Sequence, residues 1–206
     1  MHDRILFVAA NQIGKSMLLD TLAVHRFTLD HGYGYNQVII SKSKEQAKYQ
    51  MSRIRDLLNA SRVPYKTEFG EQESMNVLTL KVVDNNDSEK KKDRYDYFKY
   101  VNRIIVAPAA SGSLGYDVHD LYLDEFAFYE VEQGLAYAYN QWFEPRTYAT
   151  KGRITIFSNP NGKDHYMYDL WNQKKKDGSY RWHRYNFNFL DTPGNTVEEF
   201  EELKFL

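Results

Sequence analysis

The stretch ILFVAANQIGKSMLL, residues 5–19, constrains the fold of this 206-residue chain more than any other part of it. The apolar run over 4–10 (RILFVAA) is typical of a strand that is buried on both faces, as strands of a parallel sheet are. A short loop ending in Gly14 follows, and from about Lys15 to Leu29 the apolar residues recur at helical spacing. A buried strand that leads through a loop into a helix is the first half of an α/β unit.

Apolar runs and amphipathic segments alternate along the rest of the chain. The patterns predict strands over 36–43, 76–83, 100–109, 120–125, 153–162 and 181–189. They predict helices over 44–60, near 130–143, over 163–176, and from Thr196, which stands at capping-box spacing from Glu199. We therefore expect one α/β domain over 1–206, with a mainly parallel sheet and helices on both faces.

Composition narrows the classes of protein that remain. The formal net charge is −1 and there are no cysteines, which excludes disulfides and thiolate metal sites. No apolar run approaches the roughly 20 residues that a membrane-spanning helix needs, and the start of the chain lacks a signal peptide. We expect an intracellular protein without a membrane partner, in which any contact with nucleic acid comes from a local basic surface.

Two basic runs, Lys90–Lys92 and Lys174–Lys176, are the clearest candidates for such a surface. The first lies in a stretch without apolar residues, 84–96, which reads either as a solvent loop or as a basic finger on a nucleic-acid backbone. Both runs are also compatible with an ordinary solubilising surface.

The segment from Ala9 to Ser16 (AANQIGKS) keeps most of a phosphate-binding loop, G-x-x-x-x-G-K-[ST]. Such a loop points backbone N–H groups and a helix N-terminus at a phosphate. Lys15 would reach the β- and γ-phosphates, and Ser16 would be a ligand of Mg²⁺. Ala9 replaces the first glycine, which causes no strain if its φ is negative.

Two further strands end in polar residues. Asp124 and Glu125 follow the apolar run LYL, where the first carboxylate suits a magnesium site and the second suits the polarisation of an attacking water. The alternative is a helix N-cap followed by a first-turn acid. Ser158 and Asn159 end the run TIF, where they could contact a γ-phosphate or water, or simply cap a turn.

The three strand ends together resemble the ATPase domain of the large terminase subunit, the DNA-packaging motor of tailed bacteriophages and related viruses. AANQIGKS looks like the deviant Walker A loop of that family, DLYLDEFAFYE is similar to its Walker B strand, and FSNPNG matches its coupling motif. The strand and helix in IISKSKEQA (39–47) also look like the segment after the loop. The resemblance covers about residues 4–165 and implies a RecA-like ASCE P-loop NTPase fold.

The resemblance implies ATP and Mg²⁺ as cofactors and assigns a role to each matching position. Asp124 and Ser16 would hold the metal, Glu125 would be the catalytic base beside Lys15, and Ser158 with Asn159 would couple hydrolysis to movement. The residues expected to bind nucleotide are Ala10, Asn11, Gln12, Ile13, Gly14, Lys15, Ser16 and Met17. Gln12 fits equally well as a brace of the loop.

The chain departs from the family pattern in its arginines. Asn11 stands where many relatives have an arginine, and Leu114 precedes Gly115 where many have Arg-Gly. An arginine that stabilises the transition state is worth about 10³–10⁵ in rate, so another source is expected. Arg103, Arg146 and Arg153 are candidates, of which we favour Arg146 as the arginine finger.

The expected partners are double-stranded DNA, a portal protein and a small terminase subunit, with the subunits in a homo-oligomeric ring docked on a procapsid in the host cytoplasm. The family's segment before the first strand, which helps to form the adenine pocket, and its nuclease domain are not expected within 1–206, so no DNA cleavage is expected. Two alternatives remain, a RecA-like helicase fragment and a nucleotide-binding scaffold that does not hydrolyse ATP.

Overall fold

The structure, a computed structural model, describes residues 3–10, 13–29, 34–62, 66–69, 76–81, 101–109, 115, 117–192 and 194–203. Its centre is an eight-stranded sheet in the order β3-β4-β5-β2-β6-β7-β1-β8. The strands are β1 (Arg4–Ala9), β2 (Asn36–Ser41), β3 (Lys66–Phe69), β4 (Asn76–Lys81), β5 (Val101–Pro108), β6 (Asp120–Asp124), β7 (Arg153–Ser158) and β8 (His183–Phe187).

Six neighbouring strands, from β5 to β8 across the sheet, run parallel, and β4 and β3 add an antiparallel edge. The prediction of a mainly parallel sheet is confirmed. The sequence reading placed a strand at 76–83 but none over Lys66–Phe69, which is short and polar at three of its four positions. Because six strands are parallel, their carboxyl ends meet at one edge of the sheet, and the predicted site lies there.

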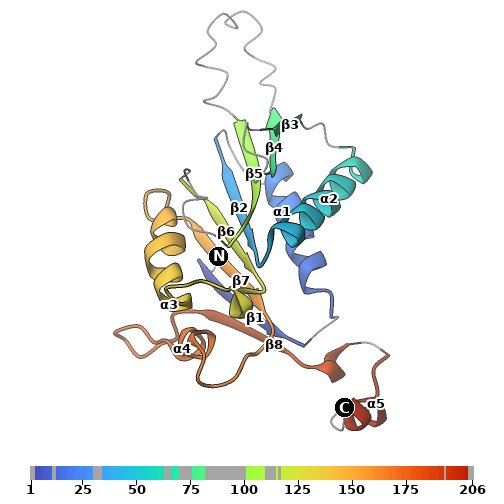
Figure 1. Ribbon diagram of the computed structural model, residues 1–206, viewed down its shortest axis with the longest axis vertical. Coiled ribbons are helices and arrows are strands. Elements are labelled where there is room, and N and C mark those ends of the chain that lie inside the picture. Colours follow the sequence, from blue (N-terminus) through green and yellow to red (C-terminus); the bar gives the residue numbers. More distant parts are fainter. Residues whose placement is uncertain are drawn as a thin grey trace, which may run out of the picture.

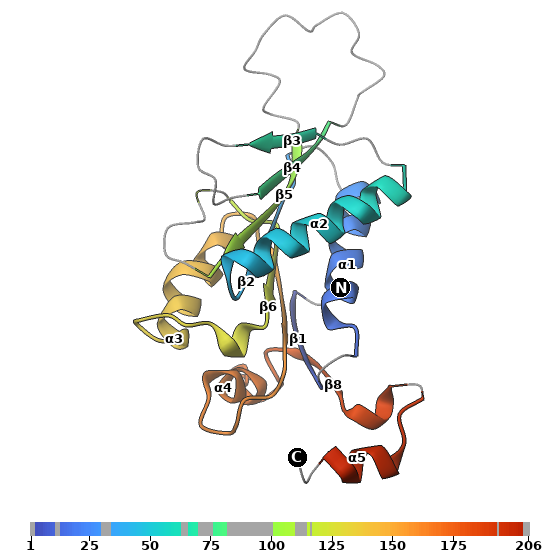
Figure 2. The same ribbon diagram turned by 45° about the vertical axis from the view of Figure 1, so that its right-hand side comes forward.

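Helices cover both faces of the sheet, as Figure 2 shows. The helices α1 (Lys15–Leu29) and α2 (Lys44–Ala60) lie on one face, and α3 (Leu135–Tyr137) and α4 (Tyr166–Asn172) lie on the other. Both α1 and α2 have the bounds expected from the sequence. The side chain of Ser43 caps α2 by accepting a hydrogen bond from the backbone N–H of Gln46.

Two predicted helices differ from the structure. The segment near 130–143 forms only a short α3, which continues as a π-helical stretch, η3 (Ala138–Phe143), and a 3₁₀ turn, η4 (Glu144–Thr147). The helix predicted over 163–176 ends at Asn172, because Gln173 is extended and Lys174 pairs with Tyr180 in a β-bridge. The expectations for 84–96, including Lys90–Lys92, lie outside the described residues.

The chain ends in a 3₁₀ turn, η5 (Phe189–Asp191), and the helix α5 (Val197–Leu203), which extend from the carboxyl end of β8 (Figure 1). The capping box at the start of α5 is confirmed. The N–H of Thr196 donates to the Glu199 carboxylate at 2.8 Å, and the N–H of Glu199 donates to the Thr196 hydroxyl at 3.2 Å.

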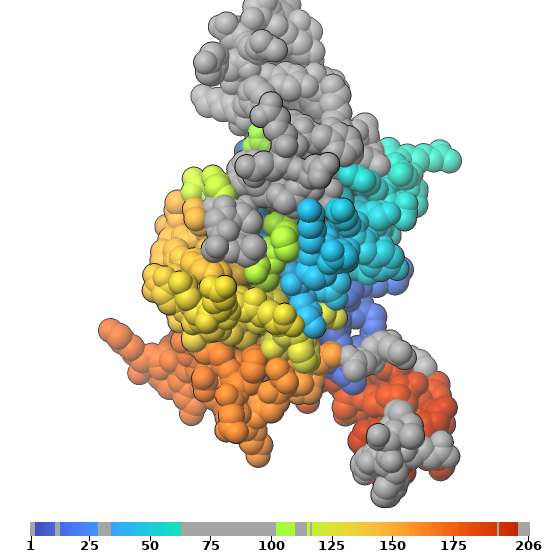
Figure 3. Space-filling view, viewed as in Figure 1, coloured from blue at the N-terminus to red at the C-terminus, as the bar shows by residue number. Residues whose placement is uncertain are grey.

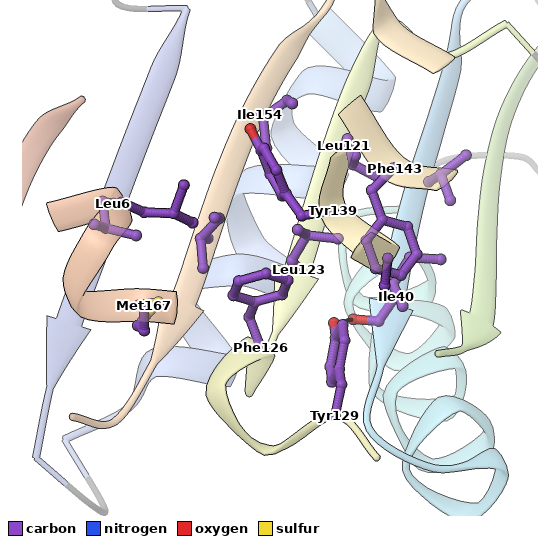
Figure 4. Packing of buried hydrophobic residues seen from close by; sticks show 14 of the residues in the cluster. Leu6, Ile40, Leu121, Leu123, Phe126, Tyr129, Tyr139, Phe143, Ile154 and Met167 are labelled. Atoms are coloured by element: carbon purple, nitrogen blue, oxygen red, sulfur yellow. Dashed lines mark hydrogen bonds between the residues drawn. The ribbon is translucent and has the colours of Figure 1, made fainter. Parts of the chain in front are cut away.

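The hydrophobic core consists of one cluster on each face of the sheet. Leu19, Ala23 and Phe27 of α1 pack with Met51 and Ile54 of α2 on the first face. On the second face, shown in Figure 4, the packed residues include Leu6, Ile40, Leu121, Leu123, Phe126, Tyr129, Tyr139, Phe143, Ile154 and Met167. The central strands β2, β6 and β7 are buried at all, or all but one, of their positions, which explains why they read as continuous apolar runs.

Candidate nucleotide site

The phosphate loop follows the carboxyl end of β1 and leads into α1. Gly14 has a φ of 84°, a conformation that glycine adopts without strain, and the first turn of α1 begins there, with the N–H of Leu18 donating to the Gly14 carbonyl at 2.9 Å. Ala9 is not among the described residues with positive φ, so the expectation for that position is confirmed. Asn11 and Gln12 lie outside the described residues.

Lys15 points back over this loop. Its Nζ donates to the carbonyl oxygens of Ala9, at 3.1 Å, and of Ala10. Burial lowers the pKa of Lys15, and the nearby carboxylates of Asp124 and Glu125 oppose that shift. The loop therefore holds a half-buried lysine that can face a phosphate, close to two acids that can face a metal ion.

Asp124 is the last residue of β6, and it lies next to the start of α1. The hydroxyl of Ser16 lies 3.4 Å from Asp124 Oδ2, while Asp124 Oδ1 is buried and has no hydrogen-bond partner among the described residues. Burial, together with the nearby acids Glu125 and Asp20, raises the pKa of Asp124 to about 7. An unpaired carboxylate oxygen in a buried position is costly, so this oxygen is suited to a cation.

These donors fit magnesium. Mg²⁺ commonly takes one or two protein oxygens and fills its other positions with phosphate oxygens and water. The hydroxyl of Ser16 and the carboxylate of Asp124 supply such a pair, and no group of three or more His, Asp or Glu residues in the described part of the chain could hold a metal by itself.

Glu125 occupies the left-handed region, with φ 55° and ψ 36°, at the turn between β6 and the 3₁₀ turn η2 (Phe126–Phe128). A conformation of this kind costs roughly 1–3 kcal/mol outside glycine and is typical of active sites. The side-chain amide of Gln46, in the first turn of α2, donates to Glu125 Oε2 at 2.8 Å. The second acid is therefore oriented by a contact from a different strand–helix unit.

Ser158, at the end of β7, contacts the turn after the acidic pair. Its buried hydroxyl accepts a hydrogen bond from the N–H of Ala127 at 3.1 Å, and the side-chain amide of Asn161 donates to the Ala127 carbonyl at 3.2 Å. Asn159 follows at the same edge, half-buried. Since β7 lies between β6 and β1, this pair of predicted residues stands between the acids and the phosphate loop.

Arg146 lies far from this edge of the sheet. It is exposed in η4, and its carbonyl accepts the N–H of Val118, two residues before β6 begins. Arg103 and Arg153 also lie at the amino ends of their strands, and Arg153 is paired there with Asp120 at 2.6 Å. Within one chain, none of the three candidate arginines lies near Asp124 and Glu125.

The sequence reading missed two polar contacts from α2. One is Gln46, and the other is a buried network around Asp20, one turn after Ser16 in α1. Asp20 accepts from Gln50 at 3.1 Å and from Arg53 at 2.6 Å, and Gln50 accepts the Ser41 hydroxyl at 2.6 Å. The sequence does place Gln46, Gln50 and Arg53 on one face of the helix. The spacing alone does not show which residues that face contacts.

The fold and this site define a class, the P-loop nucleotide-binding α/β proteins with a RecA-like sheet. Within it, residues 6–204 match the family model described as terminase large subunit, T4likevirus-type, N-terminal, so the chain belongs to that family. The expected resemblance is confirmed.

Solved structures agree. The chain is similar to the large terminase ATPase domain of Thermus phage P74-26, with a TM-score of 0.75 and 15% identity, over 100% of this chain and 83% of that one. It is also similar to the large terminase of a second thermophilic bacteriophage in complex with ATP-γ-S, with a TM-score of 0.64 and 14% identity, over 98% of this chain and 44% of that one. At these identities the likeness shows the fold. A search of curated proteins finds no match.

No helix in the described part of the chain is long and apolar enough to cross a membrane.

Proposed function

We propose that this chain is the ATP-hydrolysing, Mg²⁺-dependent motor domain of a viral DNA-packaging terminase, which couples hydrolysis to translocation of double-stranded DNA. The observation that carries the proposal is the approach of Ser16 to Asp124 beside Lys15 and Glu125, since these four groups come from two separate strand ends. Family membership adds independent support.

Each group has a role in the proposed reaction. Lys15 and the backbone from Ala10 to Met17 bind the phosphates, and Ser16 with Asp124 would hold Mg²⁺, which would neutralise phosphate charge. Glu125 takes a proton from the attacking water, with its carboxylate oriented by Gln46. Ser158 transmits a change at the γ-phosphate through its bond to the turn that carries Glu125.

The proposed motor acts as a homo-oligomeric ring with a portal protein and a small terminase subunit, on a procapsid in the host cytoplasm. Arg146 lies at the opposite edge of the sheet from Asp124, so it does not serve as an arginine finger toward the nucleotide of its own chain.

The Glu125→Gln variant tests the reaction. It should bind ATP like the parent and lose hydrolysis by about 10²–10⁴-fold, because only the base is removed. Glu130→Gln, an exposed acid five residues later, is the matched control and should keep full turnover. Unchanged turnover in Glu125→Gln would refute the base assignment, and a parent that binds ATP without hydrolysing it would favour the scaffold alternative.

A further inference from the structure

A hollow lies at the opposite edge of the sheet from the nucleotide site. It has a volume of about 880 Å³ and is lined by the amino ends of β1 and β8, by the turn at 147–152 and by residues 175–183. Four of the lining side chains are cationic, Arg4, Lys151, Lys175 and Arg181, against one carboxylate, Asp3. The chain is nearly neutral overall, so this excess of positive charge arises because the fold brings these four side chains together.

A buried acid fixes two of these cations. Glu144 of η4 is 3% exposed, and it forms ion pairs with Arg4, at 3.6 Å, and with Arg181. Arg4 also donates to the Gly152 carbonyl at 2.8 Å. One carboxylate therefore holds two guanidinium groups in place and leaves a net positive charge in the wall of the hollow.

The two lysines stand at the rim. Lys151 and Lys175 are exposed, and neither forms an ion pair with another described residue. Lys151 has a φ of 52°, in the left-handed region that non-glycine residues rarely adopt. That conformation at a turn beside a basic hollow is the kind of local strain that often accompanies a binding surface.

Residues 173–181 form a basic hairpin, which projects from the body of the molecule (Figures 1 and 3). Its two arms meet at the Lys174–Tyr180 bridge, and Gly178 turns the chain with a φ of 82°. Tyr180 is 42% exposed, and the guanidinium of Arg184 stacks on its ring at 3.3 Å, which stiffens the base of the hairpin. The run Lys174–Lys176 thus forms part of this hairpin and of the hollow beside it.

We infer that the hollow and the basic hairpin bind the phosphodiester backbone of double-stranded DNA. Exposed lysines gathered with other cations on one surface are the electrostatic footprint of a protein that binds a nucleic-acid backbone. A duplex carries one negative charge for about every 1.7 Å of its axis, so it supplies the closely spaced anions that the four cations of the hollow can neutralise. The inference rests on the proposed function only in taking DNA as the partner.

The hollow and the nucleotide site lie at opposite ends of the same strand, β1. Arg4 is the first residue of β1, and the phosphate loop follows the last residue of the same strand. Since β1 is hydrogen-bonded to β7 on one side and β8 on the other, it connects the two sites through a stiff element. DNA and nucleotide would occupy opposite ends of one strand.

The test compares two double variants by fluorescence anisotropy with a duplex of about 30 base pairs and arbitrary sequence, over a range of salt concentrations. Lys151→Ala/Lys175→Ala should bind the duplex roughly 10–100-fold more weakly than the parent at about 0.1 M salt, and the slope of log K against log salt should fall by about 2. Lys48→Ala/Lys163→Ala removes the same charge from exposed positions elsewhere and should bind like the parent.

Equal affinity and salt slope in the two double variants would overturn the inference, as would a parent that does not bind the duplex at low salt. Poly-glutamate of matched charge is a second probe, and binding of it as tightly as DNA would overturn the assignment to nucleic acid. ATP binding, measured on the same variants, distinguishes a failure of this inference from a failure of the proposed function. The hollow variant should keep ATP binding, whereas Lys15→Ala should lose it and keep DNA binding.

Discussion

The hydroxyl of Ser16 and the carboxylate Oδ2 of Asp124 lie 3.4 Å apart, although 108 positions separate the two residues in the chain. The contact joins the first turn of α1 to the end of β6. Both groups can offer an oxygen to the same cation, so this contact is the basis of the proposed metal site.

Substitution of Asp124 tests that site. Asp124→Asn should weaken Mg²⁺-dependent ATP binding by at least about tenfold, because a neutral amide replaces a charged ligand. Isothermal titration with and without EDTA measures this, and Asp117→Asn, an exposed aspartate, is the control. If Asp124→Asn kept the metal dependence of the parent, Asp124 would not be a ligand.

The Gln46–Glu125 hydrogen bond gives a second prediction. Gln46→Ala should lower kcat for ATP hydrolysis by roughly tenfold and leave KM nearly unchanged, because the base loses its orientation while the phosphate contacts remain. Lys48→Ala, on the exposed side of the same helix, should leave both parameters unchanged. A change in KM alone would place Gln46 in nucleotide binding.

Ser158 supplies a third prediction, on stability. Its buried hydroxyl is the partner of the Ala127 N–H, so Ser158→Ala leaves a buried donor unsatisfied and should lower the free energy of unfolding by about 1–3 kcal/mol. Urea denaturation measures this. Ser158→Thr keeps the hydroxyl, and it should recover hydrolysis that the alanine variant loses if the bond fixes the turn at Glu125.

Asp20 gives a prediction on pH. Burial raises its pKa in the folded state, against the opposing contacts with Arg53 and Gln50. The stabilisation from its protonated form is complete below the unfolded pKa of about 3.9 and is lost as the pH rises through the folded pKa. The free energy of unfolding of Asp20→Asn should therefore increase relative to the parent from about pH 4 upward, and a constant difference would contradict the assignment.

Local sequence patterns were sufficient for the first half of the site. The run RILFVAA, Gly14 and the helical spacing after Lys15 predicted β1, the loop and α1 with their bounds, because a buried parallel strand and a helix each carry their own periodicity. The acidic pair after LYL was found for the same reason.

Elsewhere the local pattern was misleading. A basic amphipathic stretch over 163–176 predicted one helix, yet the structure ends it at Asn172 and forms the basic hairpin, since Lys174 gains a partner in Tyr180 that the local pattern does not show. The arginine finger expected at Arg146 stays a prediction, and the strand direction adds only that Arg146 lies at the amino edge of the sheet.

The sequence by itself determined the class of this protein, because the phosphate loop and the acidic pair are short motifs that directly follow apolar strands. Only the tertiary structure decided which side chains orient the acidic pair and which surfaces surround the site. The order β5-β2-β6-β7-β1 brings α2 to Glu125 and Ser158 to Ala127. Strand order follows from long-range packing of apolar faces, which no short stretch of sequence encodes.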